Sequence, residues 1–330
     1  MLFCLKKYFE IYGNYLLILG MGILATAGTV RAKPARVVLV KSPVWEEYEQ
    51  TSRAIVSSLG SSHPELSIEE IVFETGSGGE KEFWQKVTES GPELIVTVGT
   101  ASTRSAINSV KNIPIVFTTV LDGFEALLAG SSSADIHGVT LAIPVEEQLR
   151  IMKEALPDIR RVGYLYGRNS ADVYQSAREY TSRQGIRLIA IEIASERDIP
   201  QALREIIGEV DALWMPLDAM IYYNQNIRHF ILLECFQNSV PIMAVSKKIA
   251  MAGTPLAVDV DYEDIGRQTA ELVLKRLAKG TGPSTDIQHP RKVLLYINEW
   301  VSSSLGLNIP GKVAEQAISI SVKKSVKNGR

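Results

Sequence analysis

The run ELIVTVG at Glu93–Gly99 decides the fold class, because it is apolar on both sides of an extended chain. A second run of this kind, PIVFTTV, follows at Pro114–Val120. Strands without polar alternation have both faces covered, which is typical of parallel sheets between two layers of helices. Strand and helix patterns alternate around these runs from Arg36 onward. We therefore predict an α/β fold whose first half is one doubly wound unit.

The alternation restarts at the helix pattern Pro144–Leu156 and predicts a second unit of the same kind. Its expected strands are Arg161–Gly167, Arg187–Ala194, Ala212–Asp218 and Pro241–Ser246. The last part of the chain predicts further elements, namely a strand at Pro255–Asp261, a helix at Tyr262–Lys279, a linker at Pro283–Pro290 and a strand at Val293–Asn298. Such a tail predicts a chain that crosses between two lobes more than twice.

These patterns divide the chain into two discontinuous lobes joined by a hinge. We expect lobe one to contain residues 36–142 and 260–283, and lobe two to contain residues 143–259 and 290–310. Residues 311–330 are expected to be a C-terminal tail that is partly disordered, because their end is basic and polar.

The N-terminus has the order of a secretory signal peptide, residues 1–32. Lys6 and Lys7 precede the uncharged apolar run Tyr15–Ala27, and Val30-Arg31-Ala32 follows as a small-x-small cleavage pattern. The apolar run is shorter than the roughly 20 residues of a membrane span. We expect cleavage after Ala32 and a periplasmic or extracellular protein, with a retained N-terminal anchor as the alternative.

Composition excludes several classes of protein. The 330 residues are 46% hydrophobic with a net charge of −2, and removal of three basic and one acidic leader residue would make it −4. Without a basic field we expect no nucleic-acid partner. Only Cys235 follows the leader, so no intrachain disulfide is expected. The four histidines are scattered, and we expect neither a metal nor a cofactor.

Signatures of catalysis are missing from the sequence. It has neither a G-x-S-x-G elbow nor a Walker loop. The run Gly76-Ser77-Gly78-Gly79 lacks the spacing of a phosphate cradle, so we interpret it as a flexible turn. We therefore expect no catalytic residues and a protein that is not an enzyme.

Polar residues just after the expected strands are the candidates for a binding site, because ligands of open parallel sheets bind outside the strands' carboxyl ends. The alternative for each hydroxyl, carboxylate or amide there is a helix N-cap. The candidates are Ser42, Thr100, Ala101, Thr119 and Asp122 in the first half, and Asn169, Asp218 and Ser246 in the second.

Several segments together resemble a known family. They are GTASTRSA at 99–106, NIPIVF at 112–117, PVEEQL at 144–149, LPDIRRVGYLY at 156–166, DALWMPLD at 211–218, VDYEDIGRQTA at 260–270, YIN at 296–298 and LGLNIP at 305–310. Their order and spacing resemble the ABC-transporter substrate-binding proteins of the type I periplasmic-binding fold, in the branch that includes tryptophan and tyrosine binders. The resemblance covers about Arg36 to Pro310.

The resemblance implies two α/β lobes, a small amino-acid-like ligand in the cleft, delivery to an ABC permease and no catalysis. It implies that Thr100 and Ala101 bind from lobe one, with Asp122 near the rim. From lobe two, Asp218 and Ser246 would bind the ligand, with Asn169 adjacent. The chain departs from the family pattern at Gly123, where proline is usual, and at Asp259, where glycine is usual, which leaves amino-acid specificity open.

Two other functions remain as alternatives. The same two-lobed module could serve as an exported sensor for a signalling partner. Neighbouring genes for a permease and an ATPase would favour transport, and a neighbouring gene for a membrane kinase or cyclase would favour sensing. A secreted enzyme is the third hypothesis, which a turnover screen would test. The protein is expected to be a monomer whose partners are a small-molecule ligand and the permease.

The leader generates the first testable prediction. Exported protein should begin at Lys33, because the pattern Val30-Arg31-Ala32 ends there. N-terminal sequencing of the exported protein measures this directly. Recovery of protein that still begins at Met1 would contradict cleavage.

Overall fold

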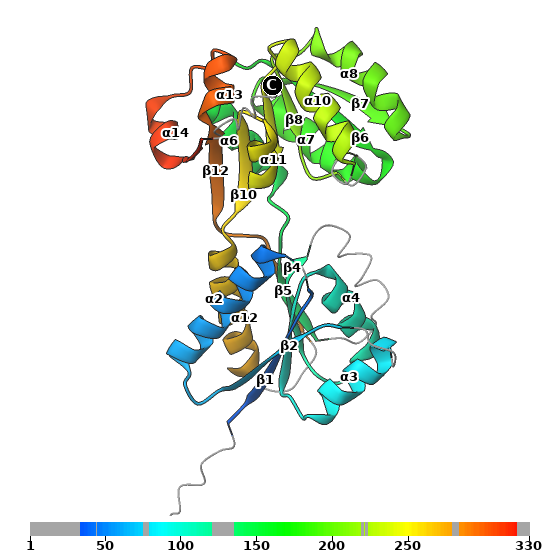
Figure 1. Cartoon of the computed structure of the whole chain (residues 1–330), viewed down its shortest axis with the longest axis vertical. Coiled ribbons are helices and arrows are strands. Elements are labelled where there is room, and N and C mark those ends of the chain that lie inside the picture. Colours follow the sequence, from blue (N-terminus) through cyan, green and yellow to red (C-terminus); the bar gives the residue numbers. More distant parts are fainter. Residues whose placement is uncertain are drawn as a thin grey trace, which may run out of the picture. The chain divides into compact units, whose positions relative to one another are not determined.

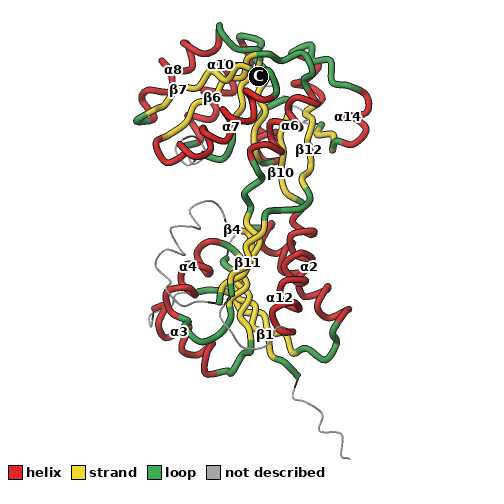
Figure 2. Tube along the Cα trace, turned by 180° about the vertical axis from the view of Figure 1, so that it is seen from behind, coloured by secondary structure: helices red, strands yellow, loops and turns green. Residues whose placement is uncertain are grey.

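The α/β architecture is seen in a computed structural model, which describes residues 34–43, 45–74, 79–120, 135–218, 221, 224–278 and 284–321. Two sheets account for its strands, and each sheet has helices on both faces (Figures 1 and 2). This confirms the predicted fold class of two doubly wound lobes. No helix in the described part of the chain has both the length and the apolar character to cross a membrane.

The sheet of lobe one is parallel throughout, with the strand order β11-β5-β4-β3-β1-β2. Its strands are β1 (Arg36–Lys41), β2 (Ser67–Val72), β3 (Leu94–Val98), β4 (Ile115–Val120), β5 (Ile136–Thr140) and β11 (Thr285–Gln288). Its helices are α2 (Glu46–Ser62), α3 (Gly79–Glu89), α4 (Thr100–Ser109) and α12 (Tyr262–Ala278). Helices α2 and α12 lie on one face of the sheet, and α3 and α4 lie on the other (Figure 1).

Strand β1 shows why its residues form this fold. Val37 and Leu39 pack into the core beneath α2 and α12, whereas Val38 and Val40 pack toward α3 and α4. All four side chains are fully buried. Because successive side chains of a strand point to opposite faces, an unbroken apolar run requires helices on both sides.

The sheet of lobe two has the order β13-β12-β10-β9-β8-β6-β7, in which β12 and β13 are parallel to each other and run antiparallel to the remaining strands. Its strands are β6 (Arg161–Gly167), β7 (Arg187–Ile193), β8 (Ala212–Met215), β9 (Ile242–Val245), β10 (Leu256–Val260), β12 (Val293–Asn298) and β13 (Ile318–Ile320). Its helices are α6 (Val145–Ala155), α7 (Ala171–Arg183), α8 (Ile199–Ile207), α10 (Gln225–Gln237), α11 (Lys247–Ala252), α13 (Glu299–Ser304) and α14 (Gly311–Gln316), with single 3-10 turns η1 (Arg168–Ser170) and η2 (Glu196–Asp198).

Four short elements differ from the sequence-based predictions. Strand β5 was not expected, and β11 lies within the expected linker. Helix α14 and strand β13 lie within the expected tail, where β13 pairs with β12. The peripheral strands β11 and β13 are at most half-buried. Hydrogen bonds to β5 define β11, whose residues are mostly polar, whereas β13 has a short Ile-Ser-Ile alternation. Strand β8 also ends at Met215, before the predicted end at Asp218.

The chain passes between the two sheets at three places, as the tail pattern predicted. The first crossing, residues 141–144, joins β5 to α6. The second is Asp261, between β10 and α12, and the third is residues 289–292, between β11 and β12. These three backbone segments form the hinge, and together they restrict its bending more than a single linker would.

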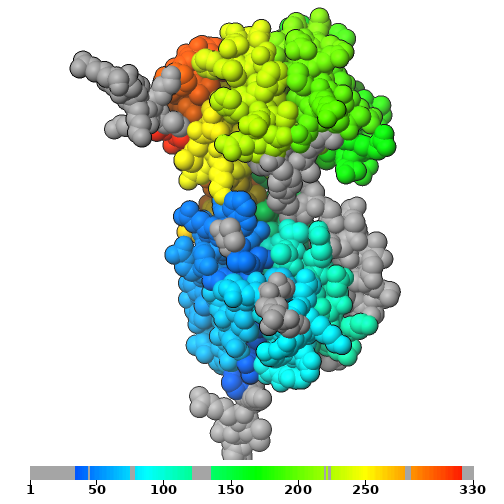
Figure 3. Space-filling model, turned by 45° about the vertical axis from the view of Figure 1, so that its right-hand side comes forward, coloured from blue at the N-terminus to red at the C-terminus, as the bar shows by residue number. Residues whose placement is uncertain are grey.

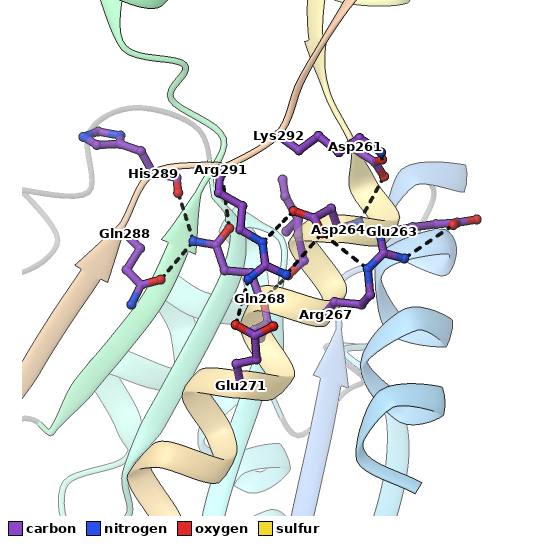
Figure 4. Close-up of polar contacts among 12 residues, drawn as sticks. Asp261, Glu263, Asp264, Arg267, Gln268, Glu271, Gln288, His289, Arg291 and Lys292 are labelled. Atoms are coloured by element: carbon purple, nitrogen blue, oxygen red, sulfur yellow. Dashed lines mark hydrogen bonds and ion pairs between the residues drawn. The ribbon is translucent and has the colours of Figure 1, made fainter. Parts of the chain in front are cut away.

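Ion pairs tie the third crossing to the start of α12 (Figure 4). Arg291 donates to both carboxylate oxygens of Asp264, at 2.9 and 3.2 Å, and to Glu271 at 2.8 Å. The Lys292 ammonium lies 2.6 Å from the carboxylate of Asp261, so the second and third crossings are themselves paired.

The amide side chain of Gln268 completes this attachment (Figure 4). Its nitrogen donates to the carbonyl oxygen of His289 at 3.0 Å, and its oxygen accepts from the backbone N–H of Arg291 at 3.4 Å. Gln268 is buried on α12, so the third crossing is fixed to lobe one through its backbone as well as through its charges.

The pKa of Asp264 generates a prediction of how the stability of the fold depends on pH. The hydrogen bond from Arg291 lowers the pKa of Asp264, and burial opposes this lowering less strongly. A carboxyl whose pKa is lower in the folded than in the unfolded protein stabilises the fold at pH values above its unfolded-state pKa. This stabilisation is lost as the pH falls through the folded-state pKa. Asp264→Asn should lower the free energy of unfolding at neutral pH by about 1–3 kcal/mol and flatten its acid dependence. Urea unfolding between about pH 2 and pH 7 measures both effects.

The neighbouring exposed carboxylate provides the control for that experiment. Glu263 pairs with Arg267 at 3.8 Å with 62% of its side chain exposed, so Glu263→Gln should change stability little. Equal losses in the two variants would contradict a special contribution from the Asp264–Arg291 pair.

The close approach of α2 and α12 generates a packing prediction. A Cβ atom at Gly266 would lie 2.5 Å from the Cβ of Ala54 and 2.7 Å from the backbone oxygen of Thr51. Gly266→Ala should therefore force the helices apart and destabilise the fold by roughly 1–3 kcal/mol. Gly60→Ala, in α2, adds its Cβ to open space and should stabilise by about 0.5–1 kcal/mol. Thermal unfolding that ranks the two variants the other way would contradict the packing argument.

Candidate functional site

Each sheet contains a point where the order of its strands reverses. In lobe one the chain runs from β1 to β2 on one side and then to β3 on the other, so the reversal lies between β1 and β3. In lobe two the reversal lies between β6 and β8 in the same way. Ligands of open α/β sheets bind outside the carboxyl ends of the strands at such points. Both reversals carry residues that the sequence singled out.

A cavity of about 370 Å³ opens at the reversal in lobe two. Two of the predicted residues, Asn169 and Asp218, line it. Ser170, which follows Asn169 after the same expected strand, also lines it. The other lining residues were not predicted, namely Gly167, Arg168, Ile193 and Ala194. The signal that could have found Gly167 and Arg168 is their position at the end of strand β6 and directly after it.

Asp218 is both a wall of this cavity and a support for it. One carboxylate oxygen accepts hydrogen bonds from the backbone N–H of Gly167 at 3.1 Å and from the hydroxyl of Ser170 at 2.6 Å. Only 5% of the residue is exposed. The two donors lie at the end of β6 and just after it, so Asp218 holds the connection from β6 to α7.

Ser246 serves as a helix cap in the structure and does not line the cavity. Its hydroxyl accepts from the backbone N–H of Lys248 at 3.2 Å, in the first turn of α11. Its φ of 109° lies in a region that side-chain-bearing residues rarely adopt. The carboxylate of Asp259 accepts from the next N–H, that of Lys247, at 2.8 Å. The turn is therefore held by two side-chain oxygens.

The reversal in lobe one lies at the start of α4. Ser42, just past β1, is buried, and its hydroxyl accepts from the backbone N–H of Ser102 at 3.0 Å. Thr100 is half-buried and Ala101 is exposed in the first turn of α4. The preceding Gly99 has φ of 96°, and a Cβ there would lie 2.8 Å from the ring of Tyr48. Ser42 thus stabilises the helix start that presents Thr100.

The end of β4 shows strain and a polar group without a partner. Thr119 is buried with φ of 54°, and its hydroxyl donates to the carbonyl of Thr118 at 2.7 Å. Among the described residues the buried hydroxyl oxygen of Thr118 has no hydrogen-bond partner. Strain and an unsatisfied polar atom are typical of functional sites. Asp122 and Gly123, which follow, lie outside the described residues.

Aromatic rings form a stacked column beside the cavity of lobe two. The ring of Tyr166 stacks on that of Tyr174 with centroids 4.8 Å apart and planes 2° apart. On its other side the ring of Tyr166 stacks on that of Tyr164. The ring centroids of Tyr164 and Trp214 are in turn 4.7 Å apart. Tyr166 directly precedes the cavity residue Gly167 in the sequence, but the rings pack against the core and are not among the lining residues.

One cluster resembles a catalytic arrangement but cannot act as one. The Nε2 atom of His137 lies 2.9 Å from an oxygen of Asp135 and 3.2 Å from the hydroxyl of Ser284. A proton relay requires the acid and the nucleophile on opposite ring nitrogens, whereas here both meet the same one. Arg276 also pairs with Asp135, so the cluster joins α12 to the sheet.

Other reactive groups are also accounted for in the described part of the chain. Burial raises the pKa of the Cys235 thiol to about 12, which keeps it protonated at neutral pH. No three His, Cys, Asp or Glu side chains of the described residues gather closely enough to hold a metal ion.

Comparisons with known proteins agree with this architecture. A family model described as "ABC transporter substrate binding protein" matches residues 69–321. A tyrosine-binding protein of Clostridioides difficile is 26% identical over 191 residues, which cover 56% of this chain and 54% of that protein. The match thus spans about half the length of that curated relative.

Solved structures share the fold. A ligand-free, open substrate-binding protein with adhesive properties from Clostridium difficile superposes with a TM-score of 0.73 at 19% identity, covering 88% of this chain and 100% of that one. An ABC domain from Streptococcus pneumoniae in complex with L-Trp superposes with a TM-score of 0.61 at 18% identity, covering 87% and 100%.

Two doubly wound lobes joined by three crossings give the chain the type I periplasmic-binding fold. Within that fold class the chain belongs to the ABC transporter substrate-binding protein family. This confirms the resemblance found in the sequence.

Proposed function

We propose that this protein captures an amino acid between its two strand reversals and delivers it to an ABC permease outside the cytoplasm, without catalysing a reaction. The observation that carries the proposal is the cavity at β6 and β8, whose wall holds the buried carboxylate of Asp218. Its volume of about 370 Å³ lies within the range typical of small-ligand pockets. Bending at the three crossings would close the lobes around the ligand.

The two reversals offer complementary charges to an amino acid. Asp218 suits an ammonium group, because a charged donor strengthens a hydrogen bond to a carboxylate. The first turn of α4 offers the hydroxyl of Thr100 and backbone N–H groups at a positive helix end, which suit a carboxylate. Thr119 and Ala101 adjoin this face, and Asn169 adjoins Asp218.

The names of the relatives suggest which amino acids to test first. One relative is a tyrosine-binding protein, and one structure with the same fold was solved with L-Trp. We therefore propose L-tyrosine and L-tryptophan as the first ligands.

Calorimetry of the parent protein and two variants tests the proposed site. At least one of the two amino acids should bind the parent protein and raise its melting temperature. Asp218→Asn should reduce affinity by about 30-fold or more, because a buried charged hydrogen bond contributes roughly 2–5 kcal/mol. Thr100→Val should reduce affinity by about threefold to tenfold, as expected for a neutral hydrogen bond. Parent-like affinity in both variants would contradict the assignment.

A matched carboxylate controls for stability. Asp211 lies at the opposite end of β8 and accepts hydrogen bonds from the backbone N–H groups of Arg160 and Arg161, each at 2.8 Å. Asp211→Asn should lower the melting temperature and leave affinity unchanged. An equal loss of affinity in this variant would show that the effect of Asp218→Asn arises from general destabilisation.

A further inference from the structure

The carboxylate of Asp259 connects a turn of lobe two to the start of α12 in lobe one. Asp259 is the penultimate residue of β10, and only 8% of it is exposed. One oxygen accepts from the backbone N–H of Lys247 at 2.8 Å. The other accepts from the N–H of Val260 at 2.8 Å and from the hydroxyl of Tyr262 at 3.4 Å. Asp259 therefore joins the strained turn after β9 to the first residue of α12, across the second crossing.

The start of α11 is also attached to α2 of lobe one. The ammonium of Lys248 lies 2.6 Å from the carboxylate of Glu47 and 4.5 Å from the centre of the Trp45 ring. In Figure 3 the yellow part of lobe two lies next to the blue part of lobe one, which is where this ion pair falls in the sequence. The second carboxylate oxygen of Glu47 is buried and has no hydrogen-bond partner among the described residues.

We propose that Asp259 is a protonation-dependent positioning residue, whose ionised carboxylate holds the Ser246–Lys247 turn in its strained conformation and couples that turn to the hinge. The positioning itself requires no ligand. Only its effect on ligand affinity rests on the function proposed above.

The surroundings of Asp259 determine its charge. The titratable groups that face it or its neighbours are Glu47, Lys247, Lys248, Asp261, Tyr262 and Tyr296. Burial raises the pKa of Asp259, and the negative charge of Glu47 adds to this rise. The N–H donors of Lys247 and Val260 and the Tyr262 hydroxyl lower it by a smaller amount. Burial also raises the pKa of Tyr296 to about 12, so that phenol stays neutral and keeps its proton.

The raised pKa of Asp259 separates its effect on the Ser246–Lys247 turn from its effect on the stability of the whole fold. A pKa raised in the folded state contributes stability below the unfolded-state pKa, and the contribution is lost as pH rises through the folded-state value. The ionised carboxylate is thus unfavourable for the whole fold at neutral pH. It is nevertheless the stronger acceptor for the three hydrogen bonds, because bonds to an ionised oxygen are stronger than bonds to a neutral carboxyl, whose added proton also needs an acceptor of its own.

Hydrogen exchange at the amides of Lys247 and Lys248 tests the positioning without any ligand. In the parent protein their protection, corrected for intrinsic exchange, should fall as pH decreases from about 8 to about 4. Asp259→Asn should reduce protection roughly tenfold at neutral pH and remove the pH dependence, while the melting temperature stays equal or rises. Tyr262→Phe removes a donor to the charged form and should move the midpoint to higher pH.

Asp261→Asn is the matched control, because Asp261 lies two residues further along and pairs with Lys292 instead. It should leave the protection of Lys247 and its pH dependence unchanged. Parent-like protection in Asp259→Asn at every pH would overturn the proposal. So would a lower melting temperature at neutral pH with a pH profile like that of the parent, because Asp259 would then be an ordinary stabilising residue.

A second measurement extends the test to binding. Calorimetry with L-tyrosine and L-tryptophan should show roughly tenfold weaker affinity for Asp259→Asn at neutral pH, converging with the parent at low pH. Unchanged affinity alongside lost protection would overturn the coupling to the site and leave the turn as a local structure. If neither amino acid binds the parent protein, the proposed ligand is wrong, and the exchange experiment still decides the role of Asp259.

Discussion

Burial of both faces of each sheet is the constraint on which the rest of this structure depends. Strands such as β1 and β3 have no exposed side, so helices must cover them above and below. Backbone and side-chain polar groups can then meet a solute only where the strands end. The reversals of strand order open those ends, which explains why Ser42, Thr100 and Asp218 all follow buried strands.

The same constraint determines how much of the fold could be predicted from the sequence. Strands β6 and β12 have the boundaries that their apolar runs predicted, because none of their side chains is exposed. Strand β11 could not be predicted, since its residues Thr285–Gln288 are mostly polar and pairing with β5 defines it. Strand β13 alternates isoleucine and serine at Ile318–Ile320, which is typical of a strand, but this short signal lies in the tail that we expected to be partly disordered.

The candidate site divides in the same way. Asn169 and Asp218 could be predicted, because position after a strand is readable along the chain. Ile193 and Ala194 could not, since they join the cavity only through the pairing of β7 with β6. The double role of Asp218, as wall and as acceptor for the Gly167 turn, is likewise a property of folded geometry. The position of a residue along the chain thus indicates candidates for the binding site, and the pairing between strands decides which other residues lie beside them.

The packing of α2 against α12 has a consequence for how the chain matures. These helices touch along Gly266 and Ala54, although about two hundred residues separate them in the sequence. Lobe one therefore lacks one cover of its sheet until α12 has been synthesised, and lobe two lacks β12 until later still. A nascent chain cannot complete either lobe early. Long-range closure of this kind slows folding and prolongs the unfolded interval.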